Sequence, residues 1–424
     1  MYVSYNHKNT ITASSEHPFH RIGQEVTHIP NEKRNPRELV GKKVHNGGVV
    51  MSLPAKPFSE LRVAVVCNWN DKCGISTYTK FLVQAMSPKV KEIAIFSEVS
   101  REQTEPDADN VIRCWSRGSN MRPAMTRLLE WKPDFIIIQH EYGIFPNACY
   151  WMQMMQMIDE IPYVVVTHSV YDHLDKAVYS SVIKNIICHT EQGKNCLRSV
   201  GNSSNIYVVP HGCIVFDKVE ELFNIMQNPY TILQFGFGFR YKGVERMLEA
   251  VASLKHNDPK FKDIFYCFML STNDHNKRAH SEYYDTLLHK IRELDIEDNT
   301  AIIRQYNSDQ MLNHHLREFK LAVFPYISNA DNIVYGSSGA ARVALSNGIP
   351  VVCSESHLFD DLEGIVPRPA SVEALVKEID EIFSNSRYRN ELLQRGRVYV
   401  TTHSWDNTAS SYLEVYSNIM ASSN

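Results

Sequence analysis

The chain has 424 residues, of which 43% are hydrophobic and 22% charged, and its formal net charge is −4. This composition is that of a globular protein with room for two or three domains. It excludes a strongly basic nucleic-acid binder, although a local basic groove stays compatible with it. No apolar run approaches the roughly 18 to 20 residues that a membrane-spanning helix needs, so no integral membrane segment is expected.

The cysteines and the N-terminus indicate a cytoplasmic protein. The nine cysteines are scattered, odd in number and without a C-x-x-C pair, which is typical of reduced thiols. The first residues, "MYVSYNHKNTITASSEHPF", lack the apolar core of a secretory signal. The histidines and cysteines also lack zinc-ligand spacing, so we expect no structural zinc.

Residues 1–59 are polar, follow no sustained period and are expected to form an N-terminal arm. Within the arm, "NEKRNPRELVGKK" concentrates basic side chains over residues 33–43. A solvated linker explains this segment, and a contact to a polyanionic acceptor is the alternative.

Residues 60–217 alternate between strand and helix patterns. "GISTYTKFLVQAM" places apolar residues at the i, i+3, i+4, i+7 spacing of a helix. Continuous apolar runs, typical of strands buried on both faces, occur at 62–67, 92–97, 134–140, 163–168, 185–190 and 205–210. Such repeated units predict a parallel, doubly wound sheet.

A polar connector follows near Pro210, and residues 218–404 then repeat the alternation. The expected strands of this second half are 231–235, 264–270, 299–305, 320–326 and 348–353. The sequence therefore predicts an α/β protein with two Rossmann-like domains that face a cleft. A helix at about 405–424 is expected to join the first domain.

The stretch "TILQFGFGFRYKGVERMLEAVASLK" places two cations where a strand passes into a helix. Gly238 and its neighbouring glycines allow a sharp turn, and the helix N-terminus adds a partial positive charge. Arg240 and Lys242 would join a site that already suits an anion at the carboxyl end of a strand. The alternative is two exposed cations on an ordinary loop.

A second loop of this kind is "YGSSGAARVALSNGIPVV", which also follows a buried strand. Ser337 and Ser338 are natural N-caps for the helix that begins near Gly339. Their hydroxyl and amide groups can also bind phosphate oxygens. A cap without any ligand would explain the same residues.

The first domain places polar residues at the matching strand ends. Gly74 lies in the loop "NWNDKCGIS", Glu141 follows the strand "DFIIIQH", and His168 ends the strand "YVVVTH". His168 is the best candidate for contact with a ligand, and His173 follows it in the same loop. Each histidine could instead be structural or simply exposed.

These motifs together resemble glycosyltransferase family 4, whose members are retaining enzymes of the GT-B fold. The motifs are "CGISTYTKFL", "IIIQHEYGIF", "PYVVVTHS", "VVPHG", "FGFGFRYKGVERMLEA" and "SSGAARVALSNGIPVVCS". The resemblance implies that the second domain binds a nucleotide-sugar and the first presents the acceptor. It assigns the donor diphosphate to Arg240 and Lys242, the sugar side to His168, and the glycine loop to Gly74.

The sequence departs from the family at one place. Many members carry two glutamates eight positions apart, and this chain has Tyr335 and Val343 there. Some branches of the family use a Ser-Ser-Gly phosphate loop in place of these glutamates, and Ser337, Ser338 and Gly339 match that loop. UDP- and GDP-sugars are the donors expected, while the ribose contacts and the base stay open.

The expected function is transfer of a sugar from a nucleotide-diphosphate-sugar to an acceptor hydroxyl, without a metal or other cofactor. The acceptor would be a saccharide, a glycolipid or a small molecule. One alternative is a bacteriophage-type DNA glycosyltransferase, which the basic arm would suit. Another is a nucleotide-sugar-binding protein without catalysis, which the missing glutamates would allow.

Overall fold

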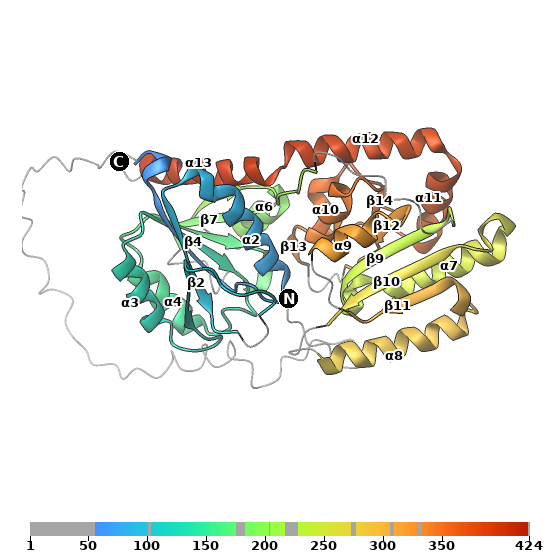
Figure 1. Ribbon diagram of the computed structural model, residues 1–424, viewed down its shortest axis with the longest axis horizontal. Helices are drawn as coiled ribbons and strands as arrows, with labels where there is room; N and C mark the ends of the chain where they lie inside the picture. The colour runs from blue at the N-terminus through green and yellow to red at the C-terminus, as the bar shows by residue number, and fades with distance from the viewer. Residues whose placement is uncertain are drawn as a thin grey trace, which may run out of the picture.

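A computed structural model describes residues 56–422 except 101–102, 175–182, 203, 217–227, 273–276, 306–308 and 329–332. These residues form two α/β lobes, each built around its own sheet (Figure 1). The basic segment at 33–43 lies outside the described residues.

The sheet of the first domain has seven strands, all parallel. Its strands in spatial order are β3 (Val111–Trp115), β2 (Glu92–Glu98), β1 (Arg62–Cys67), β4 (Phe135–His140), β5 (Tyr163–Thr167), β7 (Asn185–Cys188) and β8 (Asn205–Val208). Central strands such as β4 are buried along their whole length. Two apolar clusters, one on each face of this sheet, account for that burial.

Helices cover both faces of the first sheet. They are α2 (Gly74–Met86), α3 (Arg122–Trp131), α4 (Ala148–Met157) and α6 (Glu191–Ser199), with short 3₁₀ turns at Phe58–Glu60 and Ser87–Lys89. Helix α2 packs Tyr78, Leu82 and Met86 into the core beneath the sheet. Its other end, at Gly74, therefore lies at the carboxyl edge of β1.

The second domain repeats this plan with five parallel strands. The strands in spatial order are β11 (Thr300–Ile303), β10 (Phe265–Ser271), β9 (Thr231–Phe237), β12 (Leu321–Phe324) and β14 (Val351–Cys353). The helices are α7 (Val244–Asn257), α8 (Lys277–Glu293), α9 (Asp309–Leu316), α10 (Gly339–Ser346), α11 (Val372–Ser384) and α12 (Ser386–Thr402). Within the described residues of this domain, 3₁₀ turns lie at Arg240–Lys242, Pro259–Phe261, Glu297–Asn299 and His357–Leu362.

Two features tie the domains together. The short strands β6 (Ser169–Val170) and β13 (Tyr335–Gly336) pair across the lobes in antiparallel register. After α12, the last helix α13 (Trp405–Ser422) returns to the first lobe (Figure 1). There Trp405, Tyr412 and Tyr416 join the apolar core, and the Tyr412 hydroxyl lies 2.9 Å from that of Tyr78.

The predicted fold class is confirmed, and the differences are local. Strand β3 was not expected from the sequence, because Arg113 interrupts its short apolar run, and most of the strand is only half-buried at the edge of the sheet. The expected boundary between domains, 217/218, falls at the edge of a segment outside the described residues. None of the described helices is both long and apolar enough to cross a bilayer.

We predict that Gly212→Ala destabilises the junction between the domains. An added Cβ would lie 2.4 Å from the Trp405 ring, and forcing extra volume into a packed core costs about 1–3 kcal/mol. Gly74→Ala is the matched control, because its Cβ would meet no atom within 4 Å. Urea unfolding should show a lower free energy of unfolding for Gly212→Ala alone; equal values in the two variants would contradict this packing.

Candidate active site

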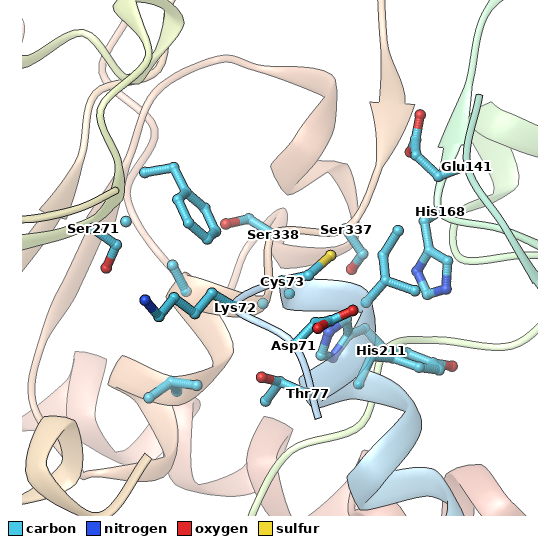
Figure 2. Close-up of a pocket in the computed structure, with 18 of the residues that line it drawn as sticks. Asp71, Lys72, Cys73, Thr77, Glu141, His168, His211, Ser271, Ser337 and Ser338 are labelled. Carbon is cyan, nitrogen blue, oxygen red and sulfur yellow. The ribbon is translucent and has the colours of Figure 1, made fainter. Parts of the chain in front are cut away.

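A cavity of about 910 Å³ lies between the two domains. Its wall combines loops at the carboxyl ends of strands from both sheets, where parallel α/β sheets bind ligands. Figure 2 shows Ser337 and Ser338 of the second domain in the same cavity as Glu141 and His168 of the first. The volume is that of a site for a ligand of nucleotide size.

Lys242 reaches this cavity from the loop that joins β9 to α7. Gly243 turns the chain there with φ 65°, and a Cβ on it would lie 1.9 Å from the Pro325 carbonyl oxygen. The Lys242 side chain is only 9% exposed and lines the cavity. Its ammonium donates a hydrogen bond to the Tyr326 hydroxyl at 2.6 Å. Burial lowers the pKa of Lys242 to about 7.

Arg240, expected beside Lys242, does not line the cavity. Its side chain is 49% exposed, lies 3.6 Å from the Glu245 carboxylate and donates to the Thr286 hydroxyl at 3.3 Å. The two cations flank one residue of a 3₁₀ turn, whose three residues per turn point successive side chains in different directions. Arg240 therefore matches the alternative of an exposed cation on the loop.

The serine loop lies at the cavity as expected, but its hydroxyls do not cap the helix. Ser337, Ser338 and Gly339 all line the cavity. Ser338 is the N-cap residue of α10, yet its side chain makes no capping bond and lies 3.3 Å from the Tyr326 hydroxyl. Ser337 donates to Asp361 instead. The positive end of α10 is therefore left for a ligand at the cavity wall.

A buried ion pair that the sequence did not reveal supports this loop. Arg342 is 1% exposed, lines the cavity and pairs with Asp361. Asp361 also accepts from Ser337 and from the Tyr399 hydroxyl, each at 3.1 Å. Burial alone would raise the pKa of Asp361, but the Arg342 charge and its hydrogen bond outweigh burial and lower it.

The first domain contributes most of its expected residues. Gly74, Glu141 and His168 line the cavity, and Glu141 accepts from the Ser169 hydroxyl at 2.7 Å. His173 does not reach it: the ring is exposed and lies 3.2 Å from Asp172. In the second domain, Gly238 is also absent from the wall, and a Cβ on it would lie 3.0 Å from the Leu270 side chain.

His168 is held as a neutral ring. Its Nε2 lies 2.7 Å from the Gln139 side-chain oxygen, and its ring meets that of Tyr78 edge-on at 4.8 Å. Burial first, and then the neighbouring His189 and His211, lower the pKa of His168 well below its ordinary value. The ring can thus offer hydrogen bonds to a ligand without adding charge at neutral pH.

Several cavity residues were not singled out in the sequence: Asp71, Lys72, His211, Ser271, Tyr326 and Arg342. Lys72 extends from the loop before α2 into the cavity, toward the side of Ser271 (Figure 2). Its place beside Gly74 in "NDKCGIS" is a signal that could have found it. Tyr326 and Arg342 gave no such signal, because each reads as an ordinary residue of a strand end or a helix.

Within the described part of the chain, no group of three or more His, Cys, Asp or Glu side chains is placed to hold a metal ion. All nine cysteines fall in this part, and none forms a disulfide.

Comparison with known proteins agrees with this fold. Residues 216–399 match the family model of glycosyl transferases group 1. No curated protein matches the sequence. Among solved structures, sucrose-phosphate synthase from Thermosynechococcus elongatus aligns with a TM-score of 0.66 and 14% identity over 86% of this chain and 100% of its own.

Two further structures show the same likeness. A glycosyltransferase from Rickettsia africae aligns with a TM-score of 0.67 and 14% identity, over 86% of this chain and 99% of its own. HepE from Anabaena, in complex with UDP and glucose, aligns with a TM-score of 0.62 and 10% identity, over 85% and 100%.

The fold is GT-B, with two parallel-sheet domains on either side of a cleft. The second domain is a glycosyl transferases group 1 domain, and the protein is a glycosyltransferase.

We predict that Asp361→Asn strongly destabilises the protein. The substitution leaves the Arg342 charge buried without its partner, which costs about 3–5 kcal/mol. Glu363→Gln is the control. It breaks the ion pair between Glu363 and Arg368, in which the Glu363 side chain is 78% exposed, and exposed pairs contribute about 0–1 kcal/mol to the free energy of unfolding. Urea unfolding measures both. If the free energy of unfolding falls no more in Asp361→Asn than in Glu363→Gln, the result would contradict the burial of the pair between Arg342 and Asp361.

Proposed function

We propose that the protein is a retaining glycosyltransferase of family 4 that uses a nucleotide-diphosphate-sugar and no divalent metal. The observation that carries this proposal is the convergence of Lys242 and the uncapped N-terminus of α10 on one cavity. These two groups supply positive charge at one place, as a departing diphosphate requires.

The donor is assigned to the second-domain side of the cavity. Its diphosphate would lie against Lys242, Ser337, Ser338 and Gly339, which come from two loops of one sheet. The sugar would then extend toward Glu141 and His168 of the facing domain, which line the same cavity. The complex of HepE with UDP and glucose supports a UDP-sugar as the first donor to test.

In the proposed reaction, the bond between the anomeric carbon and the phosphate oxygen breaks, and the electron pair stays on the diphosphate. The acceptor hydroxyl attacks the same face of the sugar, and its proton passes to the leaving phosphate oxygen. Lys242 and the α10 N-terminus stabilise the charge as it develops. His168 positions the sugar by hydrogen bonding and stays neutral.

The setting and the acceptor are also proposals. The free cysteines support a reducing, cytoplasmic location. A neutral hydroxylated acceptor, such as a saccharide, is supported by the charges on the first-domain wall. There the carboxylates of Asp71, Glu98 and Glu141 slightly outnumber the cations Lys72 and Arg117, so this wall does not attract a phosphate backbone strongly.

We predict that Lys242→Ala lowers the transfer rate at least 10²-fold, because one fixed group that stabilises leaving-group charge contributes about that much. The donor is first found by thermal-shift screening with UDP-, GDP-, ADP- and CMP-sugars, and transfer or slow donor hydrolysis is then measured. Arg240→Ala is the control, since its exposed side chain lies outside the cavity, and it should retain most activity. Near-wild-type turnover by Lys242→Ala, or no binding of any donor, would refute the proposal.

We further predict that donor affinity falls as the pH rises above about 7. Burial by the protein lowers the pKa of Lys242 to about 7, and the donor diphosphate attracts only the protonated form. Binding at higher pH must therefore take up a proton, which weakens it by up to about tenfold per pH unit. Calorimetric titration from about pH 6.5 to 8.5 measures this. The donor affinity of Lys242→Arg should not change over this pH range, because a guanidinium does not titrate there. A wild-type affinity that is also independent of pH would contradict the prediction.

A further inference from the structure

The hydroxyl of Tyr326 joins the two anion-binding loops of the second domain. It accepts a hydrogen bond from the Lys242 ammonium at 2.6 Å and lies 3.3 Å from the Ser338 hydroxyl. Lys242 belongs to the loop before α7, and Ser338 precedes α10. One phenol oxygen thus fixes the separation of two groups from different loops.

Tyr326 itself is held firmly. It lies two residues after the end of β12 and is 1% exposed. The centroid of its ring lies 4.8 Å from that of Phe359 and, in an edge-on contact, 5.7 Å from that of Tyr241. The Ser354 hydroxyl donates to its carbonyl oxygen at 2.6 Å. A ring packed on several sides and tied at its backbone gives its hydroxyl little freedom to move.

Lys242 has no comparable support of its own. A lysine side chain carries its charge at the end of a flexible stem of four carbons, so the position of the ammonium depends on its surroundings. Among the described residues, no carboxylate raises the pKa of its ammonium, which burial alone lowers. The ammonium also lies 4.0 Å from the centroid of the Tyr326 ring and 5.0 Å from that of the Tyr241 ring. The charged side chains that line the cavity around it are Asp71, Lys72, Glu98, Arg117, Glu141 and Arg342.

We propose that Tyr326 is a positioning residue of the donor site, which aligns the Lys242 ammonium with the Ser338 hydroxyl before the donor diphosphate binds. Because the phenol oxygen accepts from Lys242, it also stabilises the protonated form of that side chain. This inference rests on the proposed function, since it assigns Tyr326 a role through Lys242.

The test is Tyr326→Phe, which removes one oxygen and keeps the packed ring. We expect kcat/KM for the donor to fall about tenfold or more, because a hydrogen bond to a charged group is lost. The descending limb of the profile of kcat/KM against pH should also move to lower pH, since the charged form of Lys242 loses its acceptor. A purely structural role would change the melting temperature without moving this limb.

Tyr163→Phe is the matched control. Tyr163 is also 1% exposed, and its hydroxyl accepts from the Lys184 N–H at 2.9 Å, but it lies outside the cavity wall. A kcat/KM and a pH limb for Tyr326→Phe that equal those of this control would overturn the inference.

A second variant covers the case in which Tyr326→Phe fails to fold. Ser354→Ala loosens the backbone of Tyr326 without touching the cavity, and it should lower kcat/KM in the same direction. An unchanged kcat/KM in a folded Ser354→Ala would then overturn the inference. If Lys242→Ala is inactive while Tyr326→Phe behaves as wild type, only this inference fails. If the wild type binds none of the nucleotide-sugars, the proposed function fails with it.

Discussion

The site depends on the burial of one positive charge, the Lys242 ammonium, in the wall of the interdomain cavity. Lys242 is almost fully buried, and its described neighbours are hydroxyl groups and aromatic rings rather than carboxylates. Burying a charge without a counter-charge is costly, and the lowered pKa of Lys242 expresses that cost. An anionic ligand would relieve it. A diphosphate beside Lys242 would make the burial of this charge favourable, which separates the site from an ordinary surface cation such as Arg240.

The rest of the fold keeps that charge in place. The backbone of Lys242 is fixed by the Gly243 turn and by the Gln234 side chain, which donates to the Lys242 carbonyl at 2.8 Å. Across the loop, the buried pair of Arg342 and Asp361 supports the start of α10. The facing wall belongs to the other domain, and α13 and the pairing of β6 with β13 tie that domain to this one. The glycosyl transferases group 1 domain thus acquires its complete cavity only in the presence of the first domain.

Much of the fold followed from local patterns. The continuous apolar runs predicted the buried parallel strands, because a strand covered on both faces has no polar side to display. The half-exposed edge strand β3 lacked that pattern and was missed. In the site, glycines and cations at strand ends predicted Lys242 and the Ser337 loop. The same signal also selected Arg240 and Gly238, and the search for polar residues at strand ends selected His173; all three lie off the cavity wall.

The sequence by itself determined the two α/β domains and the strand ends at which a ligand could bind, since apolar periodicity and the glycine turns are local properties. Only the tertiary structure decided which side chains share the cavity. Arg240 and Lys242 are two residues apart, yet the 3₁₀ turn sends one to solvent and the other inward. Tyr326 and Lys242 are far apart in the chain, and the adjacency of β9 and β12 in the sheet brings them together. Direction and long-range contact depend on packing, which no short sequence window contains.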